Sequence, residues 1–290
     1  MEFGFIKEKS RIMVENIEIK PMWDIDEKID RLHRMAVVSN GWIYPPLETG
    51  VHNFSEKDKF KVQPQLPAKF FTIEPTHSIT IHTHDDEKLK FLILAYGFLL
   101  GLYLSPAEYL CLHRIPHEVG KLTGVILIKD DAEKGIYAFS RCFDTLDNER
   151  RKLAFAIMHW FLIGQSYNYV WDRFDAQYKV LDSIYKFSGL SAENHASRPV
   201  ILADHFGIKK PQWIELDKSG KSSPLSRIRN ELVHEAKFAG RPIGYAYPEE
   251  NFDFEFVRFN AKLIPAIFGL RSNFLQADPT DRNTRAWNFS

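Results

Sequence analysis

Hydrophobic and polar residues alternate in several short stretches of the first half of the chain. Alternation with a period of two, carried by β-branched and aromatic residues, is the pattern of a half-buried strand. It predicts strands at 12–14, 17–19, 71–73 and 78–82. The apolar run 122–128 predicts a further strand, followed by a turn at 129–131.

The spacing changes to that of a helix in two places of the same half. Apolar residues at 25, 29, 32 and 35 follow Asp24, which is a suitable N-cap, so a helix is predicted there. The apolar stretch 89–104 predicts a second helix that ends before Pro106. Three acidic residues precede this stretch, at 85–87, and negative charge is favourable at a helix N-terminus.

Helix-forming residues dominate from Asp147 onward. The run 147–187 has no proline and is broken only by Gly164, while Gly189 is a suitable stop. Further helices are predicted at 198–206, 224–239 and 251–275, the last bent or interrupted at Pro265. The chain is therefore predicted to be α+β, with a mixed α/β domain at 1–145 and an all-α domain at 146–290.

The balance of charge limits the partners that the whole surface can attract. The chain has 290 residues, and its 38 Lys and Arg match its 38 Asp and Glu, so the net charge is zero. Neutrality argues against a protein that coats nucleic acid or membrane. Residues 1–147 hold 18 basic and 22 acidic side chains (net −4), and residues 148–290 hold 20 and 16 (net +4). The helical half can therefore attract an anionic partner locally.

Cysteine content and the N-terminus bear on the compartment. Two cysteines, Cys111 and Cys142, are too few for a disulfide scaffold or a four-cysteine zinc site. Residues 1–10 carry four charges and no apolar run, so no secretory signal is predicted. The longest uncharged apolar stretch, 91–104, is shorter than the roughly 20 residues that cross a bilayer. We expect a cytoplasmic protein with no membrane partner.

The segment 222–239 carries the side chains best suited to chemistry. Ser223 followed by Pro224 is a good N-cap and first helical residue. One stripe of this helix is apolar, and a second is polar and consists of Arg227, Asn230, His234 and Lys237. Arg229 lies about 140° around the helix from His234, so only its long side chain can reach the same site. These groups suit phosphodiester chemistry, because they move protons, bind phosphate and fix orientation.

Residues 229–234, Arg-Asn-Glu-Leu-Val-His, match the R-N-x-x-x-H form of the signature of HEPN domains. HEPN domains are small helical bundles found in toxins, CRISPR effectors and phage-defence proteins. The resemblance covers roughly 148–275, and an aromatic segment at 173–184 contains Asp182. This part of the chain resembles ApeA-like HEPN proteins, in which an aromatic segment leads into an acidic residue and an α+β region comes first.

The resemblance implies an all-α HEPN helical bundle with metal-independent endoribonuclease activity and no cofactor. In catalytic members two protomers bring their motifs together in one cleft, so a homodimer is implied. The 2′-OH of the RNA attacks the adjacent phosphate and leaves a 2′,3′-cyclic phosphate and a 5′-OH. The RNA would be tRNA or mRNA, and the protein would be a toxin-like or antiphage effector. Residues 1–145 would sense a signal, regulate the activity or recognise the target, and a regulatory partner is a further possibility.

The resemblance also implies roles for individual residues. His234 would act as general base or acid, Arg229 would stabilise charge on the phosphate, and Asn230 would orient the reacting groups. Asp182 would orient Arg229 or His234. From the polar stripe we add Arg227 and Lys237 as contacts to RNA phosphates.

Three other interpretations stay open. A non-catalytic HEPN module would bind a nucleotide or a partner subunit through the same helix. A plain surface helix would use its Arg and His in local ion pairs with Glu231 and Glu235. A metalloenzyme would use His82 and His84, which share a face of a strand, although a polar strand face explains these histidines and His77 more simply.

Overall fold

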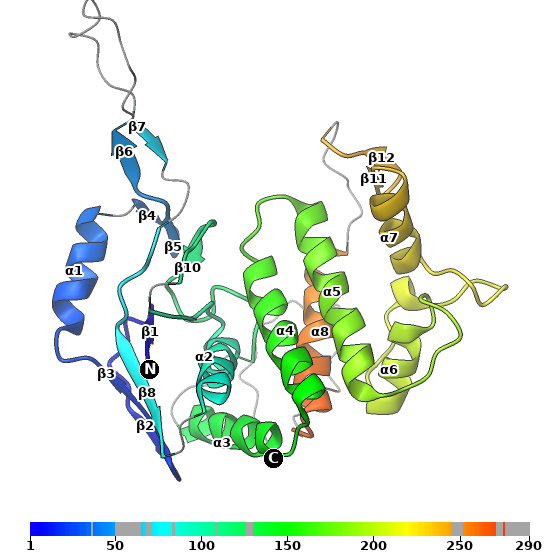
Figure 1. The fold of residues 1–290 in the computed structure, drawn as a ribbon. Coiled ribbons are helices and arrows are strands. Elements are labelled where there is room, and N and C mark those ends of the chain that lie inside the picture. The colour runs from blue at the N-terminus through cyan, green and yellow to red at the C-terminus, as the bar shows by residue number, and fades with distance from the viewer. Residues whose placement is uncertain are drawn as a thin grey trace, which may run out of the picture.

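The computed structural model describes residues 1–35, 37–49, 65–67, 71–82, 85–107, 109–125, 130–244, 252–270 and 275. These residues form eight α-helices, one short 3-10 helix and several short strands, so the protein is α+β, as the sequence predicts. Figure 1 shows the N-terminal strands on one side of the molecule and the C-terminal helices on the other.

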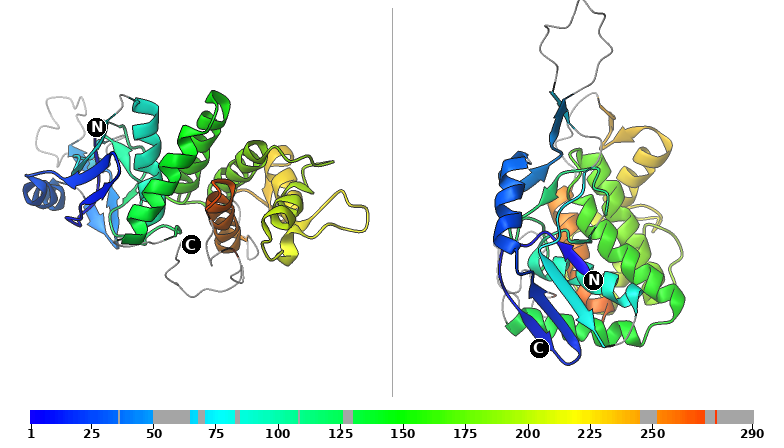
Figure 2. Two further views of the ribbon diagram at one scale, coloured as in Figure 1. Left: turned by 90° about the horizontal axis from the view of Figure 1, so that it is seen from below. Right: turned by 60° about the vertical axis from the view of Figure 1, so that its left-hand side comes forward.

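The largest sheet has five strands, and every neighbouring pair in it is antiparallel. Their spatial order is β2 (Ile12–Val14), β3 (Ile17–Pro21), β8 (His77–Ile81), β1 (Glu2–Gly4) and β9 (Ser105–Pro106). Alternation decides which face is buried: Ile17 and Ile19 pair with Ile81 and Ile79, and all but the half-buried Ile81 are inaccessible. The helix α1 (Ile25–Met35) lies beyond one side of this sheet (Figures 1 and 2).

Two smaller sheets extend the N-terminal part. One has the order β10 (Ile115–Pro116), β5 (Trp42–Tyr44) and β4 (Val37–Ser39), and the other pairs β6 (Leu47–Thr49) with β7 (Gln65–Pro67). Asn40 and Gly41 join β4 to β5 with φ angles of 48° and 78°. Positive φ at both central residues is what a tight hairpin turn requires, and Asn-Gly is the pair that adopts it most readily.

The helix α2 (Asp86–Leu100) is the centre of the hydrophobic core. Asp85 caps it, accepting a hydrogen bond from the Lys88 backbone N–H at 2.9 Å, and Gly101 ends it in the left-handed conformation. Twelve of its fifteen residues are buried, as expected of a helix that is apolar on every side. It packs against β8, β9, α3 (Asp130–Asp144) and α4 (Asn148–Gly164).

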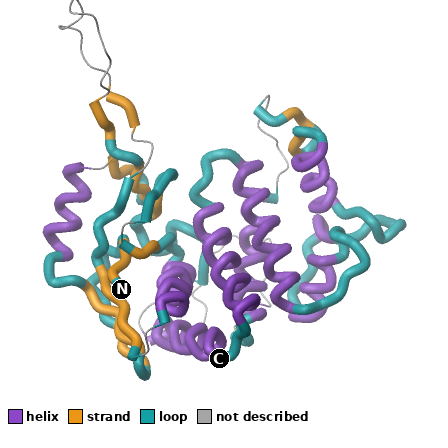
Figure 3. The backbone as a smooth tube through the Cα atoms, viewed as in Figure 1, coloured by secondary structure: helices purple, strands orange, loops and turns teal. Residues whose placement is uncertain are grey.

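The C-terminal helices pack around α5 (Val170–Ser188). Its neighbours are α4, α6 (Arg198–Phe206), α7 (Pro224–His234) and α8 (Asp253–Ile267), and the 3-10 helix Gln212–Ile214 contacts α7. Gly164 lets α4 and α5 approach closely, because a Cβ there would lie 2.4 Å from that of Ala176. Asn260 of α8 donates through Nδ2 to the backbone carbonyl and to Oε1 of Gln177 on α5, at 2.9 and 3.0 Å, and these buried hydrogen bonds join the two helices. Figure 3 shows the purple helices gathered in this part.

One hydrophobic core runs through both predicted domains. Phe98 of α2 contacts Phe161 of α4 at 5.5 Å between ring centroids, and Phe91 contacts Phe268 at 5.7 Å. The boundary at 145/146 falls between α3 and α4, and the core continues across it. The division into domains 1–145 and 146–290 stays a prediction.

Several predicted elements differ from the structure. At 71–73 the chain forms only one isolated bridge, from Phe71 to Cys111, because a longer partner strand is absent among the described residues. Residues 122–125 form no strand, and the rest of that predicted strand lies outside the described residues. The helix α3 replaces the predicted turn at 129–131, whose first residue is not described, and α7 ends five residues earlier than predicted. No helix in the described ranges is long and apolar enough to cross a bilayer.

Candidate functional site

The helix α7 begins at a reciprocal cap. Ser226 donates its backbone N–H to Ser223 Oγ at 3.2 Å, and the Ser223 backbone N–H donates to Ser226 Oγ at 2.8 Å. Leu225 and Ile228 are buried and fix the inner face against the bundle. The outer face, with Arg227, Asn230 and His234, is therefore turned to solvent.

The structure brings together the three residues of the motif. The Arg229 guanidinium donates through Nη1 to Asn230 Oδ1 at 3.1 Å, and the same nitrogen lies 3.5 Å from His234 Nε2. Because an arginine can only donate, the neutral form of His234 that accepts this contact carries its proton on Nδ1. The long arginine side chain thus spans the 140° that separates it from His234 on the helix.

The Arg229 side chain also lies near the buried ring of Tyr178. The guanidinium carbon is 5.9 Å from the centroid of this α5 side chain, which is only 5% exposed. Burial, and then the nearby charge of Asp182, raise the pKa of Tyr178 to about 12, although Arg229 and Arg198 oppose this. Tyr178 therefore stays neutral, and its ring lies against the Arg229 guanidinium.

Asp182 has a different partner from the predicted one. It accepts a hydrogen bond from Arg198 Nη1 of α6 at 2.7 Å, and the contacts within the described residues do not link it directly to Arg229 or His234. Its charge still acts on Tyr178 and on His195. Asp182 is therefore at the edge of the site, where it holds Arg198.

The two added phosphate contacts lie in different places. Arg227 is on the exposed face of α7, one turn before Asn230. Lys237 is not on the helix, because α7 ends at His234 and Ala236 takes a φ of 50°. It belongs to β11 (Lys237–Phe238), which pairs with β12 (Arg241–Pro242). A hydrogen bond to Glu235 at 3.0 Å raises the pKa of Lys237. The predicted polar stripe therefore ends at His234.

Glu231, inside the motif, and Glu235, directly after it, bind other groups. Glu231 Oε2 accepts the Gly240 backbone N–H at 2.7 Å and so ties α7 to the hairpin. Glu235 pairs with Lys237. In the part of the chain that the structure describes, neither carboxylate forms an ion pair with Arg229 or His234. The local ion pairs expected of a plain surface helix are thus not those observed.

His195 is a neighbour of the site that the sequence did not predict. It lies in the turn before α6, where its carbonyl faces the Arg198 backbone N–H at 3.4 Å. Burial, followed by the positive charges of Arg198 and Arg229, lowers the pKa of His195, and Asp182 opposes this. Tyr178, His195 and Arg198 lie at least 31 positions from the motif in sequence, so no local spacing could have revealed them.

The structure describes only one of the two histidines of the predicted metal alternative, His82, which is exposed and directly follows β8. His77 is buried in the main sheet, where its Nδ1 lies 3.1 Å from Thr76 Oγ1. Burial lowers its pKa to about 4. His84 lies outside the described residues. Among those that are described, no three His, Cys, Asp or Glu side chains are placed to hold a metal ion.

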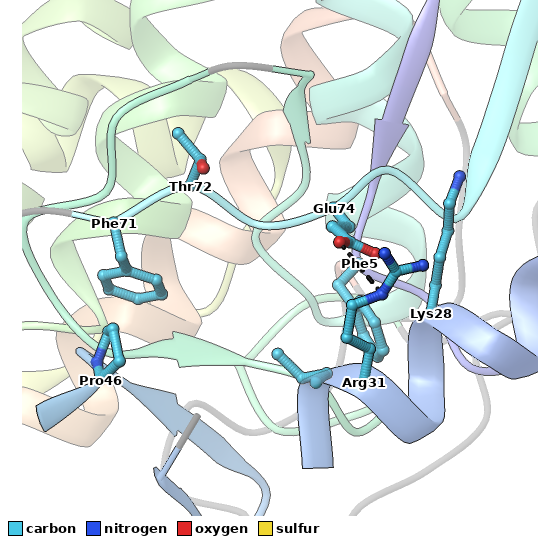
Figure 4. A pocket seen from close by; sticks show the side chains of 8 residues that line it. Phe5, Lys28, Arg31, Pro46, Phe71, Thr72 and Glu74 are labelled. Carbon is cyan, nitrogen blue, oxygen red and sulfur yellow. Dashed lines mark ion pairs between the residues drawn. The ribbon is translucent and has the colours of Figure 1, made fainter. Parts of the chain in front are cut away.

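A separate cavity of about 200 Å³ lies beside α1 (Figure 4). Its wall is mostly apolar and includes Phe5, Pro46 and Phe71. The charged groups at its rim pair with their neighbours: Arg31 with Glu74 at 3.3 Å, and Lys28 with Asp24 at 3.1 Å. The cavity therefore offers no set of convergent free polar groups, and the α7 site is the stronger candidate.

Comparisons with protein-family models, with curated proteins and with solved structures find no match to this chain. The interpretation of the site consequently rests on its own residues and their geometry.

Proposed function

We propose that this protein is a metal-independent endoribonuclease of the HEPN type, with Arg229, Asn230 and His234 as its catalytic residues. One observation carries the proposal. On the solvent-facing side of α7, the Arg229 guanidinium lies within 3.5 Å of both the Asn230 amide oxygen and the His234 imidazole. This is the combination that acid–base chemistry at a phosphodiester needs.

The reaction follows from these groups. An imidazole takes the proton of the 2′-OH, the 2′-oxygen forms a bond to phosphorus, and the bond from phosphorus to the 5′-oxygen breaks. A protonated imidazole supplies the proton that the 5′-oxygen needs. Arg229 stabilises the charge that develops on the phosphate oxygens, and Asn230 holds the guanidinium in place.

A second copy of the chain would complete the site. Each protomer has one motif histidine, and the two proton transfers call for two imidazoles. The motif face of α7 is open to a partner: Val233, next to His234, is 51% exposed. A homodimer that opposes two α7 helices would bury this apolar side chain and bring two Arg–His pairs to one cleft.

Variants of the purified protein test the assignment. Single-stranded RNA is incubated with the protein in excess EDTA, and cleavage rates are compared for the wild type, His234→Ala and Arg229→Ala. The matched control is His205→Ala, an exposed histidine of α6 outside the site. We expect His234→Ala and Arg229→Ala to lose RNA cleavage, and we expect His205→Ala to cleave RNA at the wild-type rate. Full activity of His234→Ala would refute the proposal.

The same experiment addresses a non-catalytic role. Val233 is exposed on α7 and Ile243 is exposed directly after β12, so this surface also suits a pure dimerisation module. Stable dimers with no RNA cleavage would favour this alternative. Growth arrest on expression, relieved by His234→Ala, would favour the toxin-like or antiphage role.

A further inference from the structure

Two cavities adjoin each other between α2 and α4, on a part of the molecule separate from α7. The first has a volume of about 400 Å³ and the second about 310 Å³. They share two lining residues, Lys90 of α2 and Phe155 of α4. Both volumes fall at the lower end of the roughly 300–1,000 Å³ typical of small-molecule sites. We call this feature the α2–α4 groove.

The first cavity is lined by aromatic rings. Phe155 and Tyr109 are 39% and 43% exposed at its rim, so their rings are open to a ligand. His159 lies between them: its ring is parallel to Phe155 at 6.1 Å and edge-on to Tyr109 at 6.4 Å. A planar ligand entering here meets both ring faces and ring edges.

The floor of this cavity is polar but uncharged. Tyr103 Oη lies 3.5 Å from His159 Nδ1. Burial raises the pKa of Tyr103 and lowers that of His159, so both are neutral near pH 7. The neutral Tyr103 hydroxyl and His159 imidazole can donate or accept hydrogen bonds, as the ring nitrogens and amino groups at the edge of a heteroaromatic ring require.

The second cavity is predominantly basic. Lys90, Arg151 and Lys152 line it, against one acidic residue, Glu87. Arg151 is held in place by three contacts: its Nε donates to the Leu146 carbonyl at 3.2 Å, its Nη1 lies 3.6 Å from Asp85 Oδ2, and its guanidinium carbon lies 4.9 Å from the centroid of Phe143. The ion pair with Asp85 is partly exposed, so a phosphate can compete for this guanidinium.

The other two basic groups differ in how free they are. Lys152 is paired with Glu149 at 2.7 Å but is largely exposed, so it can exchange partners at little cost. Lys90 has no ion pair among the described residues, and it stands where the two cavities meet.

We propose that the α2–α4 groove binds a nucleotide, with the base against Phe155 and Tyr109 and the phosphate at Lys90, Arg151 and Lys152. The division of the groove into an aromatic and a basic cavity supports this class of ligand. A purely apolar ligand would leave the three basic groups unused, and a simple anion would leave the aromatic cavity empty. The site is independent of the proposed ribonuclease activity, because it shares no residue with α7.

Isothermal titration calorimetry of the full chain with AMP tests the proposal. We expect saturable binding of AMP, and binding of adenosine and of inorganic phosphate that is each at least about tenfold weaker. Phe155→Ala should weaken AMP binding about tenfold, the order found when a stacking ring is removed. Phe155→Tyr keeps an aromatic ring and should retain the wild-type affinity. Lys90→Gln should weaken AMP but leave adenosine unchanged. Lys134→Gln, an exposed lysine on α3, is the control.

The result also distinguishes free nucleotides from RNA. Competition by a decamer of adenylate that binds more tightly than AMP would show that the groove holds an RNA strand. Failure of the decamer to compete would show that the ligand is a free nucleotide. No saturable binding of AMP up to about 1 mM, or the same affinity in the wild type, Phe155→Ala and Lys90→Gln, would overturn the proposal. AMP has no phosphodiester to cleave, so failure here leaves the ribonuclease proposal untouched.

Discussion

Arg229 is the residue that joins the side chains of the candidate site. Its guanidinium contacts the Asn230 amide and the His234 imidazole from one nitrogen, while its carbon faces the Tyr178 ring. The remaining N–H groups of the fork are then available for two phosphate oxygens. A lysine carries the same charge but lacks the planar guanidinium. Replacing Arg229 with lysine therefore tests whether the directed N–H groups, and not the charge alone, are needed.

Arg229→Lys is expected to reduce the rate of RNA cleavage by about 10²- to 10³-fold, the usual effect of losing one oriented donor at a developing anion. Single-turnover kinetics at saturating protein measures the rate. Arg227→Lys, on the exposed face of the same helix, should change it only a few-fold because charge is retained. Equal losses in both variants would show that Arg229 acts only as a surface charge.

His77 makes the stability of the fold depend on pH. Its folded pKa of about 4 is below the ordinary histidine value of 6.5, so the unfolded chain binds the proton more readily between these values. Stability is therefore lost as the pH falls from 6.5 towards 4. Relative to His77→Gln, the wild type should lose about 2 kcal/mol more free energy of unfolding between pH 7 and pH 4.5. Urea denaturation at both pH values measures this, and parallel changes in the two proteins would contradict it.

Close approach of two helices governs the part of the fold that supports α7. The loop after Gly164 is short, and α5 carries Tyr178 and Asp182 on the side towards α6 and α7. The residue that allows α4 and α5 to pack is a glycine facing an alanine. The contact therefore has room for one methyl group, which Ala176 supplies, and not for a second one at position 164.

Gly164→Ala is expected to destabilise the protein by about 1–3 kcal/mol, because its Cβ would overlap that of Ala176. The double variant Gly164→Ala with Ala176→Gly should recover part of this loss, since the methyl group then moves across the contact. Thermal or urea unfolding of the wild type, both single variants and the double variant measures the coupling. Additive effects in the double variant would exclude a steric contact between the two helices.

Local patterns predicted the elements that depend on local interactions. The bounds of α1 and α6 agree with the predicted ranges 25–35 and 198–206. The helix α3 also has a helical spacing of buried residues, at Ile136, Phe139 and Phe143, but two aspartates and Gly135 at its start resemble a turn. The early end of α7 depends on the hairpin that follows, which helix propensity does not register.

Across the whole molecule, the predictable part of the site is the part that is continuous in sequence. Arg229, Asn230 and His234 lie within six residues on one helix, so their pattern was visible. The supporting groups come from α5 and the start of α6, and only the packed bundle brings them near. The same holds for the α2–α4 groove, whose walls come from helices separated by α3.

The overall charge fits this arrangement. The net charge of zero combines −4 over residues 1–147 with +4 over residues 148–290, and the motif lies in the positive part. A weak excess of positive charge in this part of the sequence fits the proposed RNA contacts better than it fits a protein that coats the polymer.

The ends of the RNA fragments provide the most direct test of the central claim. RNA is incubated with purified protein in excess EDTA, and the termini of the products are identified by mass spectrometry. The account predicts 2′,3′-cyclic phosphate and 5′-hydroxyl ends that the wild type produces and His234→Ala does not. Fragments with 3′-hydroxyl and 5′-phosphate ends, or no cleavage above that of His234→Ala, would contradict it.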